Sequence, residues 1–207
     1  MRLIGLLDSP YVRRVAISLE ILGVPFKHEA VSVFSTFERF QSINPVVKAP
    51  TLVCEDGEIL MDSSLILQFV EATAAQGRSL WSSDPLELQH EFRAVSLSLA
   101  ACEKSVQIVY ERNLRPKEAQ YEPWMGRVTG QLLAAYAALE HEVQLRPAMF
   151  SAPHKQPSIT AAVVWQFTQS MLASVVPASN HRGLVNLSER LEQTSEFQKY
   201  PPVGPGV

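Results

Sequence analysis

The stretch from Leu6 to Arg14, LLDSPYVRR, joins a short apolar run to a helical pattern, and this junction constrains the fold strongly. The preceding residues, Arg2–Leu7, are rich in Leu and Ile and predict a short buried strand. Ser9 is a favoured helix N-cap, and proline is well tolerated at the first helical position. Apolar residues then recur every three or four positions until Gly23, a residue type that often ends helices. We therefore predict a strand followed by a helix that begins beside Ser9.

Ser9 lies where such a helix can stabilise negative charge. The first turn of a helix offers unpaired N–H groups and the positive end of the helix dipole, about half a unit charge. A serine hydroxyl at this point can donate a hydrogen bond to a bound anion, and a thiolate is such an anion. Capping of the backbone alone would also explain Ser9, and on this stretch by itself that is the simpler interpretation.

Composition and charge exclude several classes of partner. Of the 207 residues, 46% are hydrophobic and 19% are charged, and the formal net charge of −3 does not indicate a nucleic-acid-binding surface. No apolar run approaches the roughly 20 residues of a membrane span, and no secretory leader pattern is seen. We expect a cytoplasmic protein with neither nucleic acid nor membrane as a partner.

The cysteines and histidines do not suggest a metal site. Cys54 and Cys102 are far apart in the sequence, and each falls in an apolar stretch where a buried free thiol is the simplest interpretation. The five histidines form neither an HxxxH nor an HExxH pattern. We therefore assign no metal.

The rest of the first 77 residues continues the α/β pattern. Phe26–Val33 alternates as a second strand, which predicts a right-handed parallel crossover from the first. Spaced phenylalanines in Phe34–Ile43 predict a short or irregular helix. Two further apolar runs, Thr51–Cys54 and Ile59–Met61, flank an Asp-Gly pair, which is a strong hairpin signal. A helix follows, with Asp62 or Ser63 as its N-cap.

Two features of this region suit a peptide-like ligand, although each has a purely structural explanation. Only about one X–Pro bond in twenty is cis in folded proteins, so the sequence favours a trans Ala49–Pro50 bond. In the cis form, the backbone groups of Ala49 would point outward toward a ligand's peptide. The polar helix N-terminus at Asp62 and Ser63 suits the carboxylate and amine of an amino-acid-like ligand, but capping alone would explain both residues.

The pattern breaks between Gln76 and Pro85, and an all-helical half begins at Asp84. We expect long helices up to about Asn113 and from Trp124 to Leu145. Their expected inward-facing residues include Phe92, Val95, Leu99 and Val106 on the first and Leu132, Leu133, Tyr136 and Leu139 on the second. A buried helix over Ile159–Val175, two short helices and an extended or mobile tail over Pro201–Val207 follow. The predicted domains are residues 1–77, a linker at 78–85 and residues 86–207.

The chain as a whole resembles the cytosolic glutathione S-transferases. The resemblance rests on Ser9-Pro10-Tyr11 with Arg13, on Asn44-Pro45 with Lys48 and Pro50, and on the pair Asp62-Ser63. It is nearest to bacterial members of the serine type, which share an S-P-[FY]-x-R-[KR] opening. The resemblance implies an α/β thioredoxin-like N-terminal domain followed by an all-α C-terminal helical bundle.

The resemblance also implies roles for individual residues. Ser9 corresponds to the catalytic serine whose hydroxyl stabilises the glutathione thiolate. Pro50 corresponds to the family's cis-proline, and Ala49 would exchange backbone hydrogen bonds with the cysteinyl part of glutathione. Asp62 and Ser63 correspond to the pair that binds the γ-glutamyl group. Lys48 would help to hold the glycyl carboxylate.

The expected function is that of a glutathione S-transferase, which activates the glutathione thiolate for attack on a small hydrophobic electrophile. Glutathione would be a cosubstrate, with no covalently bound cofactor, and a homodimer is expected by analogy with the family. Two alternatives stay open: a glutathione-dependent disulfide reductase, peroxidase or isomerase, and a non-enzymatic binding or regulatory protein with the same fold. The isomerase group's S-S-C-S-x-R opening is absent.

The sequence departs from the family at the start of the buried central helix. Family members usually carry a Ser or Thr N-cap there, with an Asp three residues later. Neither plausible alignment here, Ser158 with Ala161 or Lys155 with Ser158, supplies the acid. Because that capping box is structural, we expect its loss to affect stability more than catalysis.

Overall fold

The computed structural model describes residues 1–204, which form two units. The first unit contains Met1–Leu80 together with the segment that begins at Thr194, and the second contains Trp81–Gln193. The first unit is a small mixed sheet with helices, and the second is helical. This is the predicted fold class, a thioredoxin-like N-terminal domain followed by a helical C-terminal part.

The sheet of the first unit has the strand order β2-β1-β3-β4. Its strands are β1 (Arg2–Ile4), β2 (Lys27–Glu29), β3 (Thr51–Val53) and β4 (Ile59–Met61). β1 runs parallel to β2, with Leu3 opposite His28, and antiparallel to β3, with Leu3 opposite Leu52. β3 and β4 form the predicted antiparallel hairpin. The parallel pair confirms the predicted strand-helix-strand crossover.

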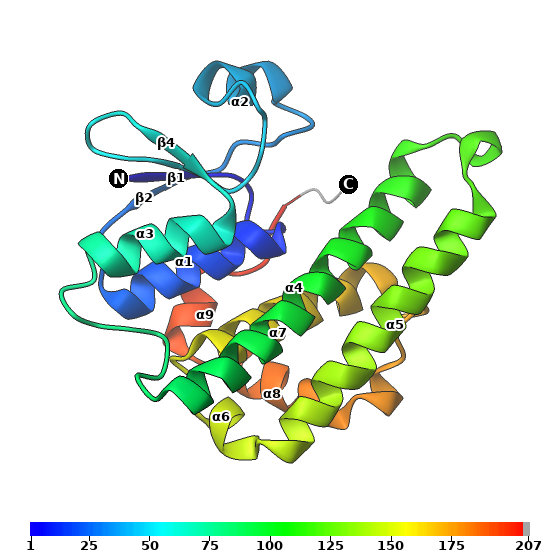
Figure 1. Ribbon diagram of the computed structural model, residues 1–207. Helices are drawn as coiled ribbons and strands as arrows, with labels where there is room; N and C mark the ends of the chain where they lie inside the picture. Colours follow the sequence, from blue (N-terminus) through cyan, green and yellow to red (C-terminus); the bar gives the residue numbers. More distant parts are fainter. Residues whose placement is uncertain (205–207) are drawn as a thin grey trace. The chain divides into compact units, whose positions relative to one another are not determined.

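The helices of the first unit are α1 (Pro10–Leu22), α2 (Phe37–Ile43), α3 (Ser63–Thr73) and α9 (Ser195–Lys199). Figure 1 shows α1 and α3 side by side on one face of the sheet, and these two helices contact each other. α1 has Ser9 as its N-cap and ends at Gly23, whose φ of 68° lies in the left-handed region that favours glycine. Both ends of α1 are therefore as predicted.

Three strands are shorter than predicted, of which β3 loses only Cys54. β1 ends at Ile4 rather than continuing to Leu7, because Gly5 turns the chain away with a φ of 141°. β2 covers only three residues of the predicted Phe26–Val33. The alternation of apolar residues continues beyond the strand because Val31 is buried against Ile4 in the core, although it makes no ladder pairing.

The second unit is built on the long helices α4 (Pro85–Leu114) and α5 (Glu122–Leu145), followed by α6 (Pro147–Ser151), α7 (Gln156–Leu172) and α8 (Arg182–Glu192). α4 begins as predicted, since the Asp84 carboxylate accepts from the backbone N–H groups of Leu86 (3.0 Å) and Glu87 (2.9 Å). α7 is buried along most of its length, as predicted for a central helix. The short helix α6 was not predicted.

The expected inward positions of Phe92 and Leu133 are wrong. Their side chains are 51% and 39% exposed, respectively. Phe92 instead packs edge-on against Trp81, with 4.8 Å between ring centroids, so its apolar area is partly covered near the surface of the second unit. Val95, Leu132, Tyr136 and Leu139 are buried as predicted, so the spacing identified the inward faces of these helices but drew them too wide at Phe92 and Leu133.

α7 begins without the usual side-chain cap. Its N-cap residue, Lys155, makes no side-chain capping hydrogen bond. The Ser158 hydroxyl donates to the Phe150 carbonyl at 3.2 Å, so this serine is satisfied by α6 rather than by the helix start. Within residues 1–204, no helix is long and apolar enough to cross a membrane.

The segment Thr194–Gly204 belongs to the first unit. The segment from Thr194 groups with Met1–Leu80, and α9 contacts α1. The predicted domain boundaries, 1–77, 78–85 and 86–207, stay a prediction. Of the predicted tail Pro201–Val207, residues 205–207 lie outside the described part of the chain.

Candidate functional site

Ser9 caps α1 through a long hydrogen bond. Its backbone is extended, with φ −71° and ψ 120°, and its Oγ accepts from the Val12 N–H at 3.4 Å. That distance exceeds the usual 2.7–3.2 Å range for N–H···O bonds. The hydroxyl also retains its own proton for donation, because in this bond it acts as the acceptor. Ser9 can therefore donate to an anion at the helix N-terminus.

Gly5 allows the first turn of α1 and the loop that ends at Pro50 to lie close together. A Cβ at Gly5 would lie 2.5 Å from Val12 Cγ2 and 3.3 Å from Ala49 Cβ. The first of these separations is shorter than real Cβ contacts, and the φ of 141° also requires glycine. The absence of a side chain at Gly5 thus brings α1 and Ala49 to the same end of β1.

The Ala49–Pro50 peptide bond is cis. The resemblance to glutathione S-transferases implied this isomer, whereas the sequence taken alone favoured trans, because most X–Pro bonds are trans. Ala49 packs against the core cluster that includes Ile4 and Phe40.

The loop before Pro50 is held by buried hydrogen bonds. Asn44 is 2% exposed, and its Nδ2 donates to Thr51 Oγ1 at 2.8 Å while its Oδ1 accepts from the Val46 N–H at 3.0 Å. Thr51 Oγ1 in turn donates to the Lys48 carbonyl at 2.7 Å. Val47 within this loop has a φ of 52°, which is unusual for a β-branched residue. The network therefore fixes the backbone on both sides of Lys48.

The second polar helix start lies at α3. Asp62 is its N-cap, and its Oδ1 accepts from Ser64 N at 2.9 Å and from Leu65 N at 3.4 Å. The φ of Asp62 is 72°, a conformation that costs free energy in a residue other than glycine. Lys48 Nζ lies 4.0 Å from Asp62 Oδ2, and both side chains are about half exposed. A cation and an anion therefore face solvent at the same place.

Arg14 connects α1 to the start of α3. Its side chain is 2% exposed, and its Nη1 donates to Ser63 Oγ and to Ser64 Oγ, both at 3.1 Å. Ser63 is itself 3% exposed. The sequence reasoning assigned no role to Arg14, although two adjacent arginines in a mostly apolar helix were a usable signal, because buried cations need partners.

Cys54 does not have the character of a reactive thiol. Burial raises the pKa of the Cys54 thiol, and the negative charges of Asp56 and Glu58 raise it further. A raised pKa keeps a thiol protonated and weakly nucleophilic. Within residues 1–204, no group of three or more His, Cys, Asp and Glu side chains could hold a metal ion.

All the predicted site residues lie in the first unit: Ser9, Lys48, Ala49, Pro50, Asp62 and Ser63. The structure joins them in two ways. Lys48 and Asp62 form a contact of opposite charges, and Arg14 links the helix that begins at Ser9 to Ser63.

The first unit matches a known protein family. Residues 3–78 match the family model described as "Glutathione S-transferase, N-terminal domain". Among curated proteins, the chain is 33% identical over 87 residues to the uncharacterized GST-like protein YibF of Escherichia coli (strain K12), covering 42% of this chain and 43% of that protein. It is 27% identical over 86 residues to glutathione S-transferase U4 of Arabidopsis thaliana, covering 42% of this chain and 35% of that one. The matches thus span less than half of these relatives.

Two further similarities cover more of the chain. Over 136 residues the chain is 29% identical to maleylacetoacetate isomerase of Pseudomonas aeruginosa, which covers 61% of this chain and 63% of that enzyme. The crystal structure of a glutathione S-transferase from Methylobacterium radiotolerans, in complex with glutathione sulfonate, aligns with a TM-score of 0.88 and 25% identity. That alignment covers 100% of this chain and 96% of the other. Residues 3–78 thus match the N-terminal domain of glutathione S-transferases, and the chain as a whole has the fold of this crystal structure.

Proposed function

We propose that the protein is a glutathione S-transferase that uses Ser9 to stabilise the thiolate of bound glutathione. The observation that carries the proposal is the position of Ser9, whose hydroxyl caps the N-terminus of α1 through a long bond and keeps its proton available. The Methylobacterium radiotolerans glutathione S-transferase described above was solved in complex with glutathione sulfonate, which supports glutathione as the ligand.

The physical chemistry of a serine suits this role. A free cysteine thiol has a pKa of about 8.5, so most of it is protonated at neutral pH. Lowering that pKa by two units requires about 3 kcal/mol of preferential stabilisation of the thiolate. A hydrogen bond from Ser9 to the sulfur and the positive end of the α1 dipole both stabilise the anion. Ser9 does not need to lose its own proton.

The remaining site residues would hold the peptide. The backbone of Ala49, before the cis Pro50, would pair with the cysteinyl part of glutathione. Asp62 and Ser63 at the start of α3 would bind the γ-glutamyl amine and carboxylate. Lys48, a cation 4.0 Å from Asp62, would attract the glycyl carboxylate. One peptide would thus contact three segments of the first unit.

The reaction we propose is substitution at an electrophilic carbon. The thiolate forms a carbon–sulfur bond with the acceptor, and the leaving group departs with the bonding electron pair. The thiol proton is released to solvent when the thiolate forms. The physiological acceptor would be small and hydrophobic, and the enzyme would act in the cytoplasm.

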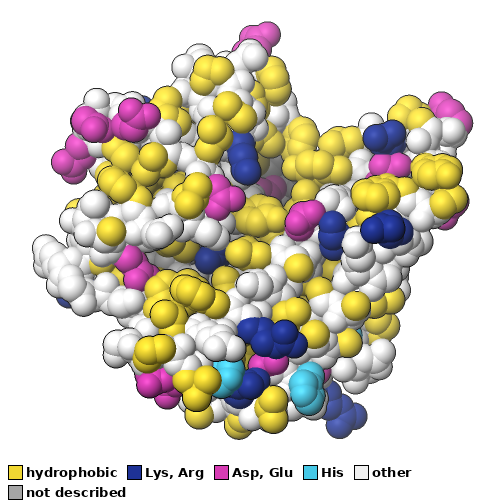
Figure 2. Space-filling model, viewed as in Figure 1, with side chains coloured by type: hydrophobic (Ala, Val, Ile, Leu, Met, Phe, Trp, Pro, Cys, Tyr) yellow, Lys and Arg dark blue, Asp and Glu magenta, His cyan; other side chains and the backbone are white. Residues whose placement is uncertain are grey.

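We also propose a homodimer. Large apolar side chains are exposed at the connected ends of α4 and α5, where Leu114 is 50%, Tyr121 64% and Trp124 43% exposed. Figure 2 shows hydrophobic side chains gathered at this end of the α4–α5 pair, at the upper right. Exposed apolar groups of this kind are typical of protein interaction surfaces. Sedimentation or light scattering of the purified chain would measure its mass directly.

A second candidate is a glutathione-dependent isomerase. It is supported by the 29% identity to maleylacetoacetate isomerase of Pseudomonas aeruginosa, which extends over more of this chain than the matches to the plant enzymes. An isomerase would also activate the thiolate of glutathione but would release glutathione unchanged. The missing S-S-C-S-x-R opening counts against it.

The proposal is tested by isothermal titration of glutathione into the purified protein, together with turnover of a chloronitrobenzene acceptor by wild type and Ser9→Ala. We expect binding, and turnover that falls sharply in the variant. Binding without turnover of this acceptor would contradict the aryl-transfer reaction and direct the search to isomerase substrates and disulfides. No binding at millimolar glutathione would contradict the proposal and favour a non-enzymatic protein.

A further inference from the structure

α9 is attached to α1 by a buried cation. The Arg13 side chain is 1% exposed, and its Nε donates to the Tyr200 carbonyl at 2.8 Å. Its guanidinium carbon lies 5.4 Å from the centre of the Phe197 ring, a cation–π geometry. Arg13 is the fourth helical residue of α1, so the C-terminal segment contacts the helix within about one turn of Ser9.

A second set of contacts holds the same segment further along α1. The Glu20 carboxylate accepts from Lys199 Nζ at 2.7 Å and from the Tyr200 hydroxyl at 2.8 Å. The Lys199 hydrogen bond lowers the pKa of Glu20, against the opposing effect of burial. The Tyr200 ring also stacks on Phe26, with 5.7 Å between centroids. Tyr200 is therefore held in place on α1, and Pro201–Gly204 follow it in the chain.

The four residues after Tyr200 have little conformational freedom. Pro201 and Pro202 each have φ restricted to about −65°. The Val203 N–H donates to the Pro201 carbonyl at 2.8 Å, closing a tight three-residue turn. Four residues span at most about 14 Å when fully extended, so this segment cannot move far from Tyr200.

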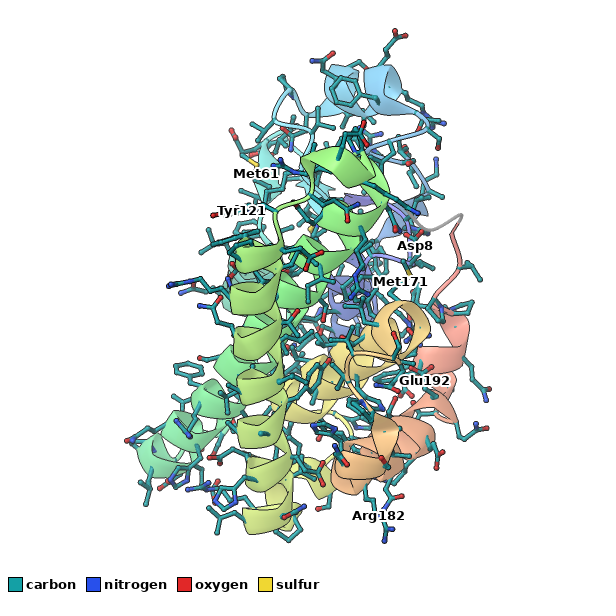
Figure 3. The ribbon with its side chains drawn as sticks, turned by 90° about the vertical axis from the view of Figure 1, so that its right-hand side faces the viewer. Asp8, Met61, Tyr121, Met171, Arg182 and Glu192 are labelled. Carbon is teal, nitrogen blue, oxygen red and sulfur yellow. The ribbon has the colours of Figure 1, made fainter. Side chains whose placement is uncertain are left out.

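The far end of the segment lies against Asp8. A Cβ at Gly204 would lie 2.1 Å from Asp8 Oδ2 and 2.8 Å from Asp8 Cβ, so only glycine fits without displacement. Figure 3, in which Asp8 is labelled, shows the red C-terminal segment rising to the level of this residue. Asp8 directly precedes Ser9 in the chain.

These contacts lie on both sides of Ser9 in the chain, at Asp8 and at Arg13. The segment Pro201–Gly204 starts at the Tyr200 carbonyl, which Arg13 binds, and ends at Asp8, so it lies along the first turn of α1. We propose that Pro201–Gly204 forms part of the acceptor site, providing apolar surface for the group that becomes attached to the glutathione sulfur. This inference rests on the proposed function, because the sulfur would lie at Ser9.

The chemistry of the segment indicates the class of acceptor. Pro201, Pro202 and Val203 carry no polar side-chain atoms, and Val203 is 59% exposed although it follows residues held firmly in place. The carboxylate of Asp8 lies beside Gly204, at the end of this segment. An apolar substituent gains about 25 cal/mol per Å² of apolar area that it covers on such a surface, whereas a charged one loses hydration there without a partner among these side chains.

Binding of S-substituted glutathiones tests the inference without requiring turnover. The probes are glutathione and S-hexylglutathione, titrated calorimetrically into wild type, Val203→Ser, Gly204→Ala and a chain that ends at Tyr200. Leu86→Ser is the control for removal of an exposed apolar side chain, since Leu86 is 62% exposed in the second unit. Gly126→Ala is the control for an added methyl group, since a Cβ there meets nothing within 4 Å.

We expect the Kd of S-hexylglutathione to rise five- to tenfold in Val203→Ser and in the shortened chain, with that of glutathione unchanged within twofold. Gly204→Ala should also raise the Kd of S-hexylglutathione. In both control variants the Kd of each ligand should equal that of wild type. Equal changes for the two ligands, or a fall in melting temperature with no change in their affinity ratio, would overturn the inference and leave the segment a structural role. If wild type binds neither ligand, the proposed function fails first, and this inference fails with it.

Discussion

Arg14 Nη1 lies 3.1 Å from Ser63 Oγ, so a buried cation on α1 donates a hydrogen bond to a hydroxyl at the start of α3. A serine oxygen that accepts from Arg14 has its own proton free for another acceptor. The proposed acceptor is the γ-glutamyl carboxylate, which the positive charge of Arg14 would also attract. Arg14 would thus position Ser63 without touching glutathione.

Replacing Arg14 by Met should weaken glutathione binding. The variant loses two hydrogen bonds to serine hydroxyls and the nearby positive charge, so we expect Kd to rise about tenfold, which corresponds to about 1.4 kcal/mol. In a Ser63→Ala background the same change should add little, because the hydroxyl through which Arg14 acts is already gone. Calorimetry on the four proteins of this cycle measures the coupling. Additive losses would show that Arg14 acts independently of Ser63.

Asn44→Ala should destabilise the loop that holds Lys48 and Ala49. The change leaves the buried hydroxyl of Thr51 and the N–H of Val46 without their Asn44 partners. Each lost hydrogen bond costs about 0.5–1.5 kcal/mol, so we expect a loss of about 2 kcal/mol in the free energy of unfolding and weaker glutathione binding. Urea unfolding and calorimetry check both effects. Gln41→Ala, at an exposed position on α2, should change neither, and a similar loss in that control would remove the loop-specific explanation.

Glu142 makes the helical unit sensitive to acid. Its carboxylate accepts from Arg93 Nε at 2.8 Å and pairs with Arg146, while its side chain is only 4% exposed. Burial disfavours the charged form, but the two arginines outweigh burial and lower the pKa of Glu142. Because the pKa is lower in the folded state, this group stabilises the fold above its unfolded pKa of about 4.3, and that contribution is lost as the pH falls through the folded value.

Glu142→Gln should therefore reduce the free energy of unfolding at pH 7 by about 1–3 kcal/mol and by progressively less below pH of about 4. Urea unfolding of wild type and variant across this range measures the difference. Glu189→Gln, an exposed carboxylate on α8, serves as the control. A difference that stays constant down to pH 3 would contradict the assignment of this acid sensitivity to Glu142.

The sequence predicted those parts of the fold that depend on local chemistry. Four helix ends lie where they were predicted, because caps and left-handed glycines are determined by residue type. The capping residues are Ser9, Gly23, Asp62 and Asp84. The Asp-Gly hairpin was found for the same reason. These features need no knowledge of distant contacts.

Other features depend on residues far apart in the chain and were missed. β1 ends at Ile4 because Gly5 lies against Val12 and Ala49, which the local apolar pattern does not reveal. Phe92 was placed inward because its partner Trp81 could not be inferred from helix spacing. Arg13 and Arg14 were read only as part of a motif, and their bonds to Tyr200 and Ser63 join segments that are 187 and 49 residues away.

The Ser9 hydroxyl has two roles in the proposed mechanism: it caps α1, and it stabilises the thiolate. Two substitutions distinguish these roles. Ser9→Ala removes both the cap and the hydroxyl, at a cost of about 1 kcal/mol in stability. Ser9→Asp retains a good cap but places a negative charge beside the sulfur. The two variants thus differ in stability yet should share the loss of thiolate stabilisation.

The most direct measurement is the pKa of the thiol of bound glutathione, followed by the ultraviolet absorbance of the thiolate as pH is raised, in wild type, Ser9→Ala and Ser9→Asp at saturating glutathione. We expect a thiol pKa in the wild-type complex about two units below that of free glutathione, and a rise of at least one unit in both variants, with Ser9→Asp as stable as wild type. A thiol pKa in wild type equal to that of free glutathione, or one that both substitutions leave unchanged, would contradict the account.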